Sequence, residues 1–189
     1  NLKSLVIGIS GGLDSAVVAA LCQEEYIGVP LLGINISLDN SLESIEKAEH
    51  IGRSYCSGYL EFSDWEEKYF SRESIESQSF ESVPFYERVF DVLNQTNSFA
   101  EAMGFALPNE NIRKGNMKAR LRMMTLYDLA KKTGGAVLST DNLSEYYAGF
   151  WTLHGDVGDI APIQYLWKGS EVVNLAYELG IREDIITQA

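Results

Sequence analysis

The feature that most constrains the fold is a short glycine-rich segment placed between a strand-like run and a helix-like run. Ser10-Gly11-Gly12-Leu13-Asp14-Ser15 follows the apolar residues 5–9 and precedes the helix-like residues 16–22. A strand, a tight turn and a helix in this order turn backbone N–H groups and a helix N-terminus toward one point, which favours an anion. Glycine removes the Cβ atoms that would block close approach. The alternative is a plain turn rich in small residues, but turn chemistry explains neither the aspartate nor the two flanking serines.

The side chains of this segment suggest a phosphate ligand. The hydroxyls of Ser10 and Ser15 add donors, and the carboxylate of Asp14 stands where a magnesium ion bridging phosphates could bind. The segment is not a Walker loop, because no Gly-Lys-Ser/Thr follows it.

The composition excludes several classes of protein. A chain of 189 residues with 46% apolar content is predicted to form one domain with a core of its own. A formal net charge of −12 argues against a nucleic-acid-binding surface. No run of about 18 apolar residues occurs, so we expect no membrane span. Cys22 and Cys56 form no CxxC pair, which favours a reducing compartment, here the cytoplasm, and no zinc site.

Strand and helix patterns alternate along the chain. Strands are predicted at 5–9, 31–36, 59–62 and 136–140, and helices at 15–23, 41–51, 115–132 and 170–179. This alternation predicts an α/β fold with a doubly wound, mostly parallel sheet, helices on both faces and a ligand at the carboxyl ends of the strands. Residues from about 64 to 109 are less readable, and we expect an insertion there within the single domain.

A second polar segment follows the last predicted strand. Thr140-Asp141-Asn142-Leu143-Ser144-Glu145 comes at a strand end, so we expect Thr140 and Glu145 in the same crevice as the glycine-rich segment. Glu145 could then be a second magnesium carboxylate opposite Asp14. The structural alternative is a helix cap, since Asn142 lies three residues before Glu145 as in a capping box. Both can hold together.

Residues 149–162 form a loop rich in glycine, aspartate and large aromatic residues. Such a loop is costly to order, which favours a binding role over a connector. Phe150 and Trp151 could stack on a ligand ring, or they could pack in the core.

Four segments together resemble one family. Residues 8–15, 114–123, 140–145 and 149–162 occur in this order in the NAD synthetases, a family of ATP pyrophosphatases. The chain resembles the ammonia-dependent form or the synthetase domain of the glutamine-dependent form. The resemblance implies that the nicotinate carboxylate of deamido-NAD attacks the α-phosphorus of ATP and pyrophosphate leaves. Ammonia then attacks the acyl-adenylate, which releases NAD and AMP.

The resemblance also implies roles for individual residues. The ATP phosphates would be bound by Gly8, Ile9, Ser10, Gly11, Gly12, Leu13, Asp14 and Ser15. Thr140 and Lys168 would contact ATP, and Asp14 and Glu145 would hold Mg2+. Arg120 and Asp159 would contact deamido-NAD, although Arg120 could instead belong to a solvated helix face with Lys118 and Arg122.

The resemblance further implies a homodimer, because the family builds its dinucleotide site across two subunits. No glutamine-hydrolysing domain is visible in the sequence, and neither cysteine has a recognisable nucleophile setting. Ammonia is therefore the expected nitrogen donor, and a partner glutaminase stays open.

The chain departs from the family pattern at two places. Leu153 replaces a substrate-binding lysine, and the loop after Asp156 is one residue shorter. We also expect the family's C-terminal segment beyond Ala189 to be missing from this sequence. Two alternatives stay open: another adenylating ATP pyrophosphatase, such as a GMP synthetase-like or a tRNA-modifying enzyme, and a nucleotide-binding relative that has lost turnover. The acidic charge and unpaired cysteines count against tRNA modification.

Overall fold

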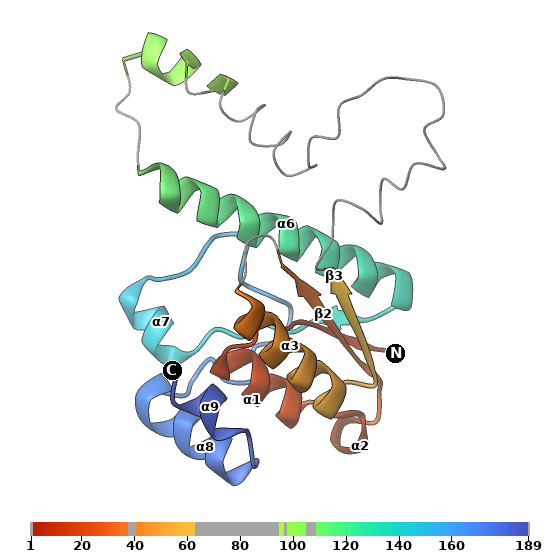
Figure 1. The fold of residues 1–189 in the computed structure, drawn as a ribbon. Coiled ribbons are helices and arrows are strands. Elements are labelled where there is room, and N and C mark those ends of the chain that lie inside the picture. Colours follow the sequence, from red (N-terminus) through yellow and green to blue (C-terminus); the bar gives the residue numbers. More distant parts are fainter. Residues whose placement is uncertain (1, 38–40, 63–94, 97, 105–108, 189) are drawn as a thin grey trace. The chain divides into compact units, whose positions relative to one another are not determined.

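A computed structural model describes residues 2–37, 41–62, 95–96, 98–104 and 109–188 (Figure 1). The chain divides into two compact units, one made of residues 1–63 and 118–189 and the other of residues 64–117. Most of the region expected to be an insertion, 64–109, lies outside the described residues; within it, residues 98–102 are helical. The sheet and the site below belong to the first unit.

The sheet has four parallel strands among the described residues. They are β1 (Leu5–Gly8), β2 (Leu31–Ile36), β3 (Gly58–Phe62) and β4 (Ala136–Val137), in the order β3-β2-β1-β4. Leu5 pairs with Leu31 on one side and with Ala136 on the other. The predicted strand 136–140 is shorter than expected: beyond Val137 it continues only as an isolated bridge between Leu138 and Ile160, and the Ser139 N–H donates to the Ile160 carbonyl at 2.7 Å.

One face of the sheet is covered by α1 (Leu13–Leu21) and α3 (Leu42–Tyr55); α8 (Val173–Glu178) packs on α1, and α9 (Glu183–Ile186) packs on α8. Figure 1 shows α1 and α3 side by side in front of the strands. Leu5, Ile7 and Ile9 alternate along β1 and its end, so all three turn toward this face, where they join the buried core. α1 is buried along most of its length, which explains its continuous apolar sequence.

The other face is covered by α6 (Glu110–Thr133), of which the part from Lys118 onward belongs to the first unit. Met123, Leu126 and Ala130 are buried on this helix, and a Cβ on Gly8 would lie 3.3 Å from Leu126 Cδ1. Helices therefore lie on both faces of a parallel sheet, which confirms the predicted fold class. α6 begins before the predicted residue 115 because Asn109 initiates it, its Oδ1 accepting from the Asn111 N–H at 2.9 Å.

Short helices complete the first unit. α2 (Glu24–Ile27), which the sequence pattern did not predict, ends at Gly28 with φ 77°. α7 (Leu143–Ala148) follows β4, and the π-helical turn η2 (Lys168–Val172) leads directly into α8, so the helix predicted at 170–179 starts earlier. Within the described residues, no helix is long and apolar enough to cross a membrane.

Candidate active site

The site lies where the strand order reverses direction. From β1 the chain crosses to β2 on one side and later returns to β4 on the other, which leaves a crevice at the carboxyl ends of β1 and β4. A pocket of about 460 Å³ opens there. Its lining combines the glycine-rich loop, the segment after β4, the end of β2 and one face of α6. Residues that line it include Gly8, Ile9, Ser10, Gly12, Asp14, Ser15, Ile36, Arg122, Met123, Thr140, Asp141 and Glu145.

The backbone of the glycine-rich loop explains two of its glycines. Gly11 has φ 84°, and a Cβ there would collide with the carbonyl oxygen of Ser44 on α3. Gly12 is the N-cap of α1 and brings no side chain to cap it. The first-turn N–H groups of α1, which have no intrahelical partners, therefore receive no hydrogen bond from a capping side chain, and the positive end of the helix dipole is at the pocket.

The two serines are hydrogen-bonded to the loop itself in the described structure. Ser15 Oγ donates to the Gly12 carbonyl at 2.9 Å, so the 3.2 Å contact between the two hydroxyls has Ser10 as its donor. Ser10 Oγ in turn accepts from the Gly12 N–H at 3.2 Å. These hydroxyls thus fix the loop shape, and a direct bond from either to a phosphate stays a prediction.

The carboxylate of Asp14 has a partner at each oxygen. Lys168 Nζ donates to Oδ2 at 2.9 Å, and Asn142 Nδ2 donates to Oδ1 at 3.2 Å. Asp14 is more deeply buried than Lys168, their side chains being 16% and 34% exposed. Glu145 lies on α7, and the predicted capping box is confirmed: Asn142 Oδ1 accepts from the Glu145 N–H, while Glu145 Oε2 accepts from the Asn142 N–H.

The carboxylates of this pocket disfavour one another's charge. Burial is the main cause that raises the pKa of Glu145; the hydrogen bond from Asn142 opposes it, and the charge of Asp14 adds to it. Burial also raises the pKa of Asp141, with further contributions from Asp156 and Asp14. A cation would relieve this repulsion, and carboxylate oxygens are the ligands that magnesium prefers.

The donor set also limits what kind of metal fits. Among the described residues, no group of three or more His, Cys, Asp or Glu side chains is arranged to hold a metal ion. Asp14 and Glu145 alone would leave most positions of an octahedral ion to phosphate oxygens and water. That division of ligands is typical of magnesium in nucleotide enzymes.

Two predicted substrate residues lie elsewhere. Of the described residues, those lining the pocket include neither Arg120 nor Asp159. Arg120 Nε donates to the Leu153 carbonyl at 3.1 Å. Asp159 accepts from the Val137 N–H at 2.9 Å and from the Tyr127 hydroxyl at 3.2 Å, so its carboxylate fastens the loop to β4.

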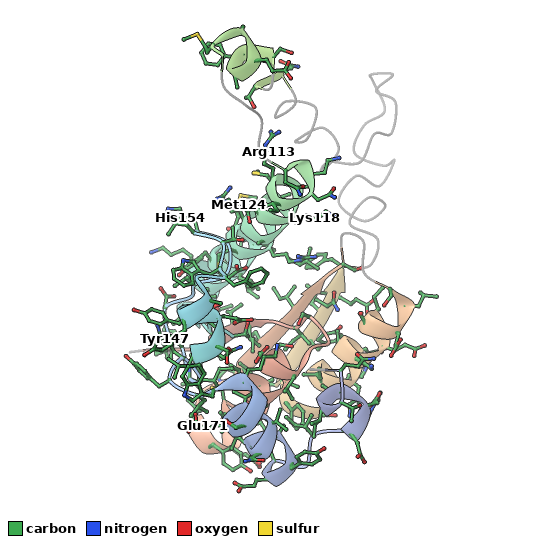
Figure 2. The ribbon with its side chains drawn as sticks, turned by 90° about the vertical axis from the view of Figure 1, so that its left-hand side faces the viewer. Arg113, Lys118, Met124, Tyr147, His154 and Glu171 are labelled. Atoms are coloured by element: carbon green, nitrogen blue, oxygen red, sulfur yellow. The ribbon has the colours of Figure 1, made fainter. Side chains whose placement is uncertain are left out.

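The aromatic residues of the loop are not core residues. Phe150 is 78% exposed and lines the pocket, and Trp151 is 43% exposed and stacks on Tyr146 at 5.8 Å between ring centroids. Figure 2 shows Tyr147 at the outer surface of α7, where it stacks on Trp167. The core-packing interpretation of Phe150 and Trp151 is therefore wrong, because the loop runs over the surface of α7 and α6.

Arg122, Ser44 and Asn142 are among the residues at the pocket that were not assigned to the site from the sequence. Arg122 lines the pocket, and its Nε donates to the Ile36 carbonyl at 3.0 Å. Ser44 reaches the pocket from the start of α3, and Asn142 contacts Asp14. The sequence held a signal for Arg122: it lies three residues after Ala119, so the two share one face of a helix. Ala119 and the neighbouring Met123 also line the pocket.

Comparison with known proteins identifies relatives over the whole chain. The family model described as NAD synthase matches residues 1–189. The chain is 34% identical over 187 residues to an NH(3)-dependent NAD(+) synthetase of Mycoplasmopsis pulmonis, covering 98% of this chain and 60% of that protein. It is 35% identical over 189 residues to the enzyme of the same description from Mycoplasma genitalium, covering 99% of this chain and 64% of that protein.

Solved structures agree in fold. One described as NMN synthetase from Francisella tularensis superposes with a TM-score of 0.71 at 29% identity, covering 98% of this chain and 65% of that one. An NH3-dependent NAD synthetase from Campylobacter jejuni superposes with a TM-score of 0.73 at 24% identity, covering 100% and 69%. The chain spans about 60 to 65% of the length of the curated relatives that it matches. By the family model and these relatives, the chain belongs to the NAD synthase family.

Proposed function

We propose that this protein catalyses the ATP-dependent amidation of deamido-NAD to NAD, with ammonia as the nitrogen donor and an acyl-adenylate as the intermediate. One observation carries the proposal. The pocket at the β1–β4 switch brings the carboxylates of Asp14 and Glu145 together with the glycine-rich loop and the N-terminus of α1. This combination suits a reaction in which negative charge develops on a leaving pyrophosphate.

The phosphates of ATP would lie against residues 8–15. The first-turn N–H groups of α1 offer donors that need no reorganisation when the charge develops. Lys168 adds a cation at the same place, through its contact with Asp14. Local positive charge matters here because the formal net charge of the chain is −12.

Asp14 and Glu145 would hold Mg2+, which when bound neutralises charge on the departing pyrophosphate. Lys168 balances the Asp14 carboxylate in the described structure. We propose that the Lys168 ammonium would turn from Asp14 to a phosphate oxygen of ATP when Asp14 holds Mg2+. Thr140 lines the pocket on the same side and offers a hydroxyl to ATP.

The adenosine would lie in the other half of the pocket. Ile36, Met123 and Leu126 provide an apolar surface there, and Arg122 is fixed beside them by the Ile36 carbonyl. This leaves the α-phosphate between the apolar half and the glycine-rich loop, open to the acceptor.

The chemistry then follows in two displacements. An oxygen of the nicotinate carboxylate bonds to the α-phosphorus, and the bond to pyrophosphate breaks. The lone pair of ammonia attacks the acyl carbon, AMP leaves with the bonding electrons, and the nitrogen loses a proton to form the amide. Adenylation is needed because a free carboxylate has a poor leaving group. We further propose that Arg120 and Asp159 contact deamido-NAD and that a second copy of the chain completes its binding site.

A mononucleotide acceptor is the second candidate. The solved relative from Francisella tularensis is described as an NMN synthetase, and amidation that yields NMN starts from nicotinate mononucleotide. The observation in its favour is Leu153, an exposed apolar side chain where the resemblance implies a lysine for the dinucleotide.

The test is release of pyrophosphate by the full-length protein with ATP, Mg2+ and ammonium, alone and with each acceptor. Release only with deamido-NAD, with NAD formed in equal amount, supports the first function. Release only with nicotinate mononucleotide supports the second. No release with either acceptor, despite ATP binding, contradicts both. Sedimentation of the same sample tests the homodimer.

A further inference from the structure

Asn142 links both proposed magnesium carboxylates. Its side chain is fully buried, with 0% exposure. Nδ2 donates to Asp14 Oδ1 at 3.2 Å, and Oδ1 accepts from the Glu145 N–H at 3.1 Å. Its backbone N–H donates to Glu145 Oε2 at 3.2 Å. The N-cap residue of α7 thus contacts one carboxylate on α1 and another on α7.

The hydrogen bonds determine which way the amide points. The Glu145 N–H can only donate, so the atom facing it must be the amide oxygen. The amide nitrogen then faces Asp14 Oδ1, a carboxylate oxygen that accepts its hydrogen bond. Both contacts are consistent with a single orientation of the side chain.

A helix cap alone does not require asparagine. Serine, threonine and aspartate accept from first-turn N–H groups about as well. Serine is too short to reach a distant carboxylate in addition, and aspartate has no hydrogen to donate to Asp14. The bond to Asp14 spans 128 residues of sequence and is the part that capping leaves unexplained.

We propose that Asn142 is a positioning residue that fixes Asp14 relative to Glu145 for magnesium. This inference rests on the proposed function, because it assigns Mg2+ to these two carboxylates. Without the amide, Asp14 keeps only Lys168 as a side-chain partner among those described, and that ion pair draws the carboxylate toward η2. Loss of a partner that orients a metal ligand typically lowers metal affinity 10- to 100-fold.

Two variants separate positioning from capping. Asn142→Ser keeps a cap but cannot reach Asp14, whereas Asn142→Ala removes both. Calorimetric titration of Mg2+ into the full-length protein, saturated with a non-hydrolysable ATP analogue, gives the affinity without turnover. Thermal unfolding without Mg2+ gives the stability of each variant. Asn109→Ser is the matched control, because it makes the same change at the start of another helix.

The proposal predicts that both Asn142 variants lose Mg2+ affinity about 10-fold or more. Only Asn142→Ala should show the lower unfolding temperature of a lost cap. In turnover assays, saturating Mg2+ should restore most of kcat for Asn142→Ser. Wild-type Mg2+ affinity in Asn142→Ser would overturn the proposal and leave a cap only, and so would a wild-type protein that binds no Mg2+ when saturated with the analogue.

Failure of the proposed function looks different. In that case the wild-type protein binds Mg2+ and the analogue, yet produces no NAD or NMN from either acceptor. The Mg2+ affinities of the variants then still decide the role of Asn142.

Discussion

The glycine-rich loop and the loop at 149–162 both have hydrogen bonds of their own but differ in how many distant elements hold them. The first is closed by its own short-range bonds, as between Ser10 and Ser15, and is backed by Ser44 of α3. The second is fastened to distant elements, through Asp159 to β4 and through the Leu153 carbonyl to α6. One loop presents backbone donors to a pocket, while the other presents exposed apolar side chains. The loop proposed to bind the nucleotide is thus shaped mainly by its own bonds, whereas the loop proposed to bind the acceptor also depends on hydrogen bonds to β4 and α6.

The largest expected effect comes from disrupting the close packing of the glycine-rich loop against α3. Gly11→Ala places a Cβ against the Ser44 carbonyl at φ 84°, so loop and helix must separate. We expect a loss of roughly 2 kcal/mol or more in unfolding free energy and loss of ATP binding. Gly28→Ala is the matched control, since φ is 77° but nothing lies within 4 Å of its Cβ. Equal effects in both, measured by urea unfolding, would contradict a packing role for Gly11.

Removing the charge of Asp14 tests the proposed chemistry at the glycine-rich loop. Asp14→Asn leaves Lys168 without its carboxylate and removes a proposed Mg2+ ligand. We expect kcat/KM to fall by on the order of 10²-fold or more. Asp128→Asn removes a carboxylate from an exposed i,i+4 pair with Lys132 and should leave kcat/KM unchanged. A similar loss in both variants would mean that the effect is not local to the pocket.

In the loop at 149–162, we expect Asp159→Asn to lower mainly the free energy of unfolding. The asparagine can keep only part of the bonding to the Val137 N–H and the Tyr127 hydroxyl, which costs about 1 kcal/mol. ATP affinity should stay unchanged. Tyr127→Phe removes only the phenol hydroxyl and serves as the control. A rise in KM for deamido-NAD in Asp159→Asn alone would support the predicted substrate contact; equal KM values would assign Asp159 to the loop only.

The pH dependence of unfolding stability tests the charge of Glu145 in the pocket. Because the pKa of Glu145 is raised in the folded state, its charge costs stability above that pKa, and the cost is relieved as pH falls through it. Glu145→Gln should therefore stabilise the metal-free protein at pH 7, by an amount that shrinks toward pH 5. Thermal unfolding across this range checks it. A difference that is independent of pH would contradict the role of the carboxylate charge.

The smallest effect is expected at Leu153. Leu153→Lys restores the side chain that the family resemblance implies, while its backbone carbonyl can still accept from Arg120. We expect KM for deamido-NAD to fall by a few-fold, in line with one exposed charge contact. KM for ATP is the internal control. An unchanged KM for deamido-NAD would favour the mononucleotide acceptor.

The patterns that the sequence predicted well are those decided by near neighbours. The strand at 31–36 and the capping box of Asn142 with Glu145 both need only residues a few positions apart. The strand at 136–140 was overpredicted, since pairing by residues near 160 decides where it ends. Phe150 and Trp151 looked like candidates for the core, and their exposure depends on the path of the whole loop.

By itself, the sequence determined the order of the four strands and of the longer helices, the parallel α/β class and the glycine-rich loop with Asp14. These follow from periodicity, from caps and from the conformational freedom of glycine, all of which act over a few residues. Only the tertiary structure decided that Asn142 contacts Asp14, that Lys168 pairs with it, and that Arg122 reaches the pocket. Such contacts join residues 86 to 154 positions apart, so they depend on strand order and crossover geometry, which local sequence patterns do not encode.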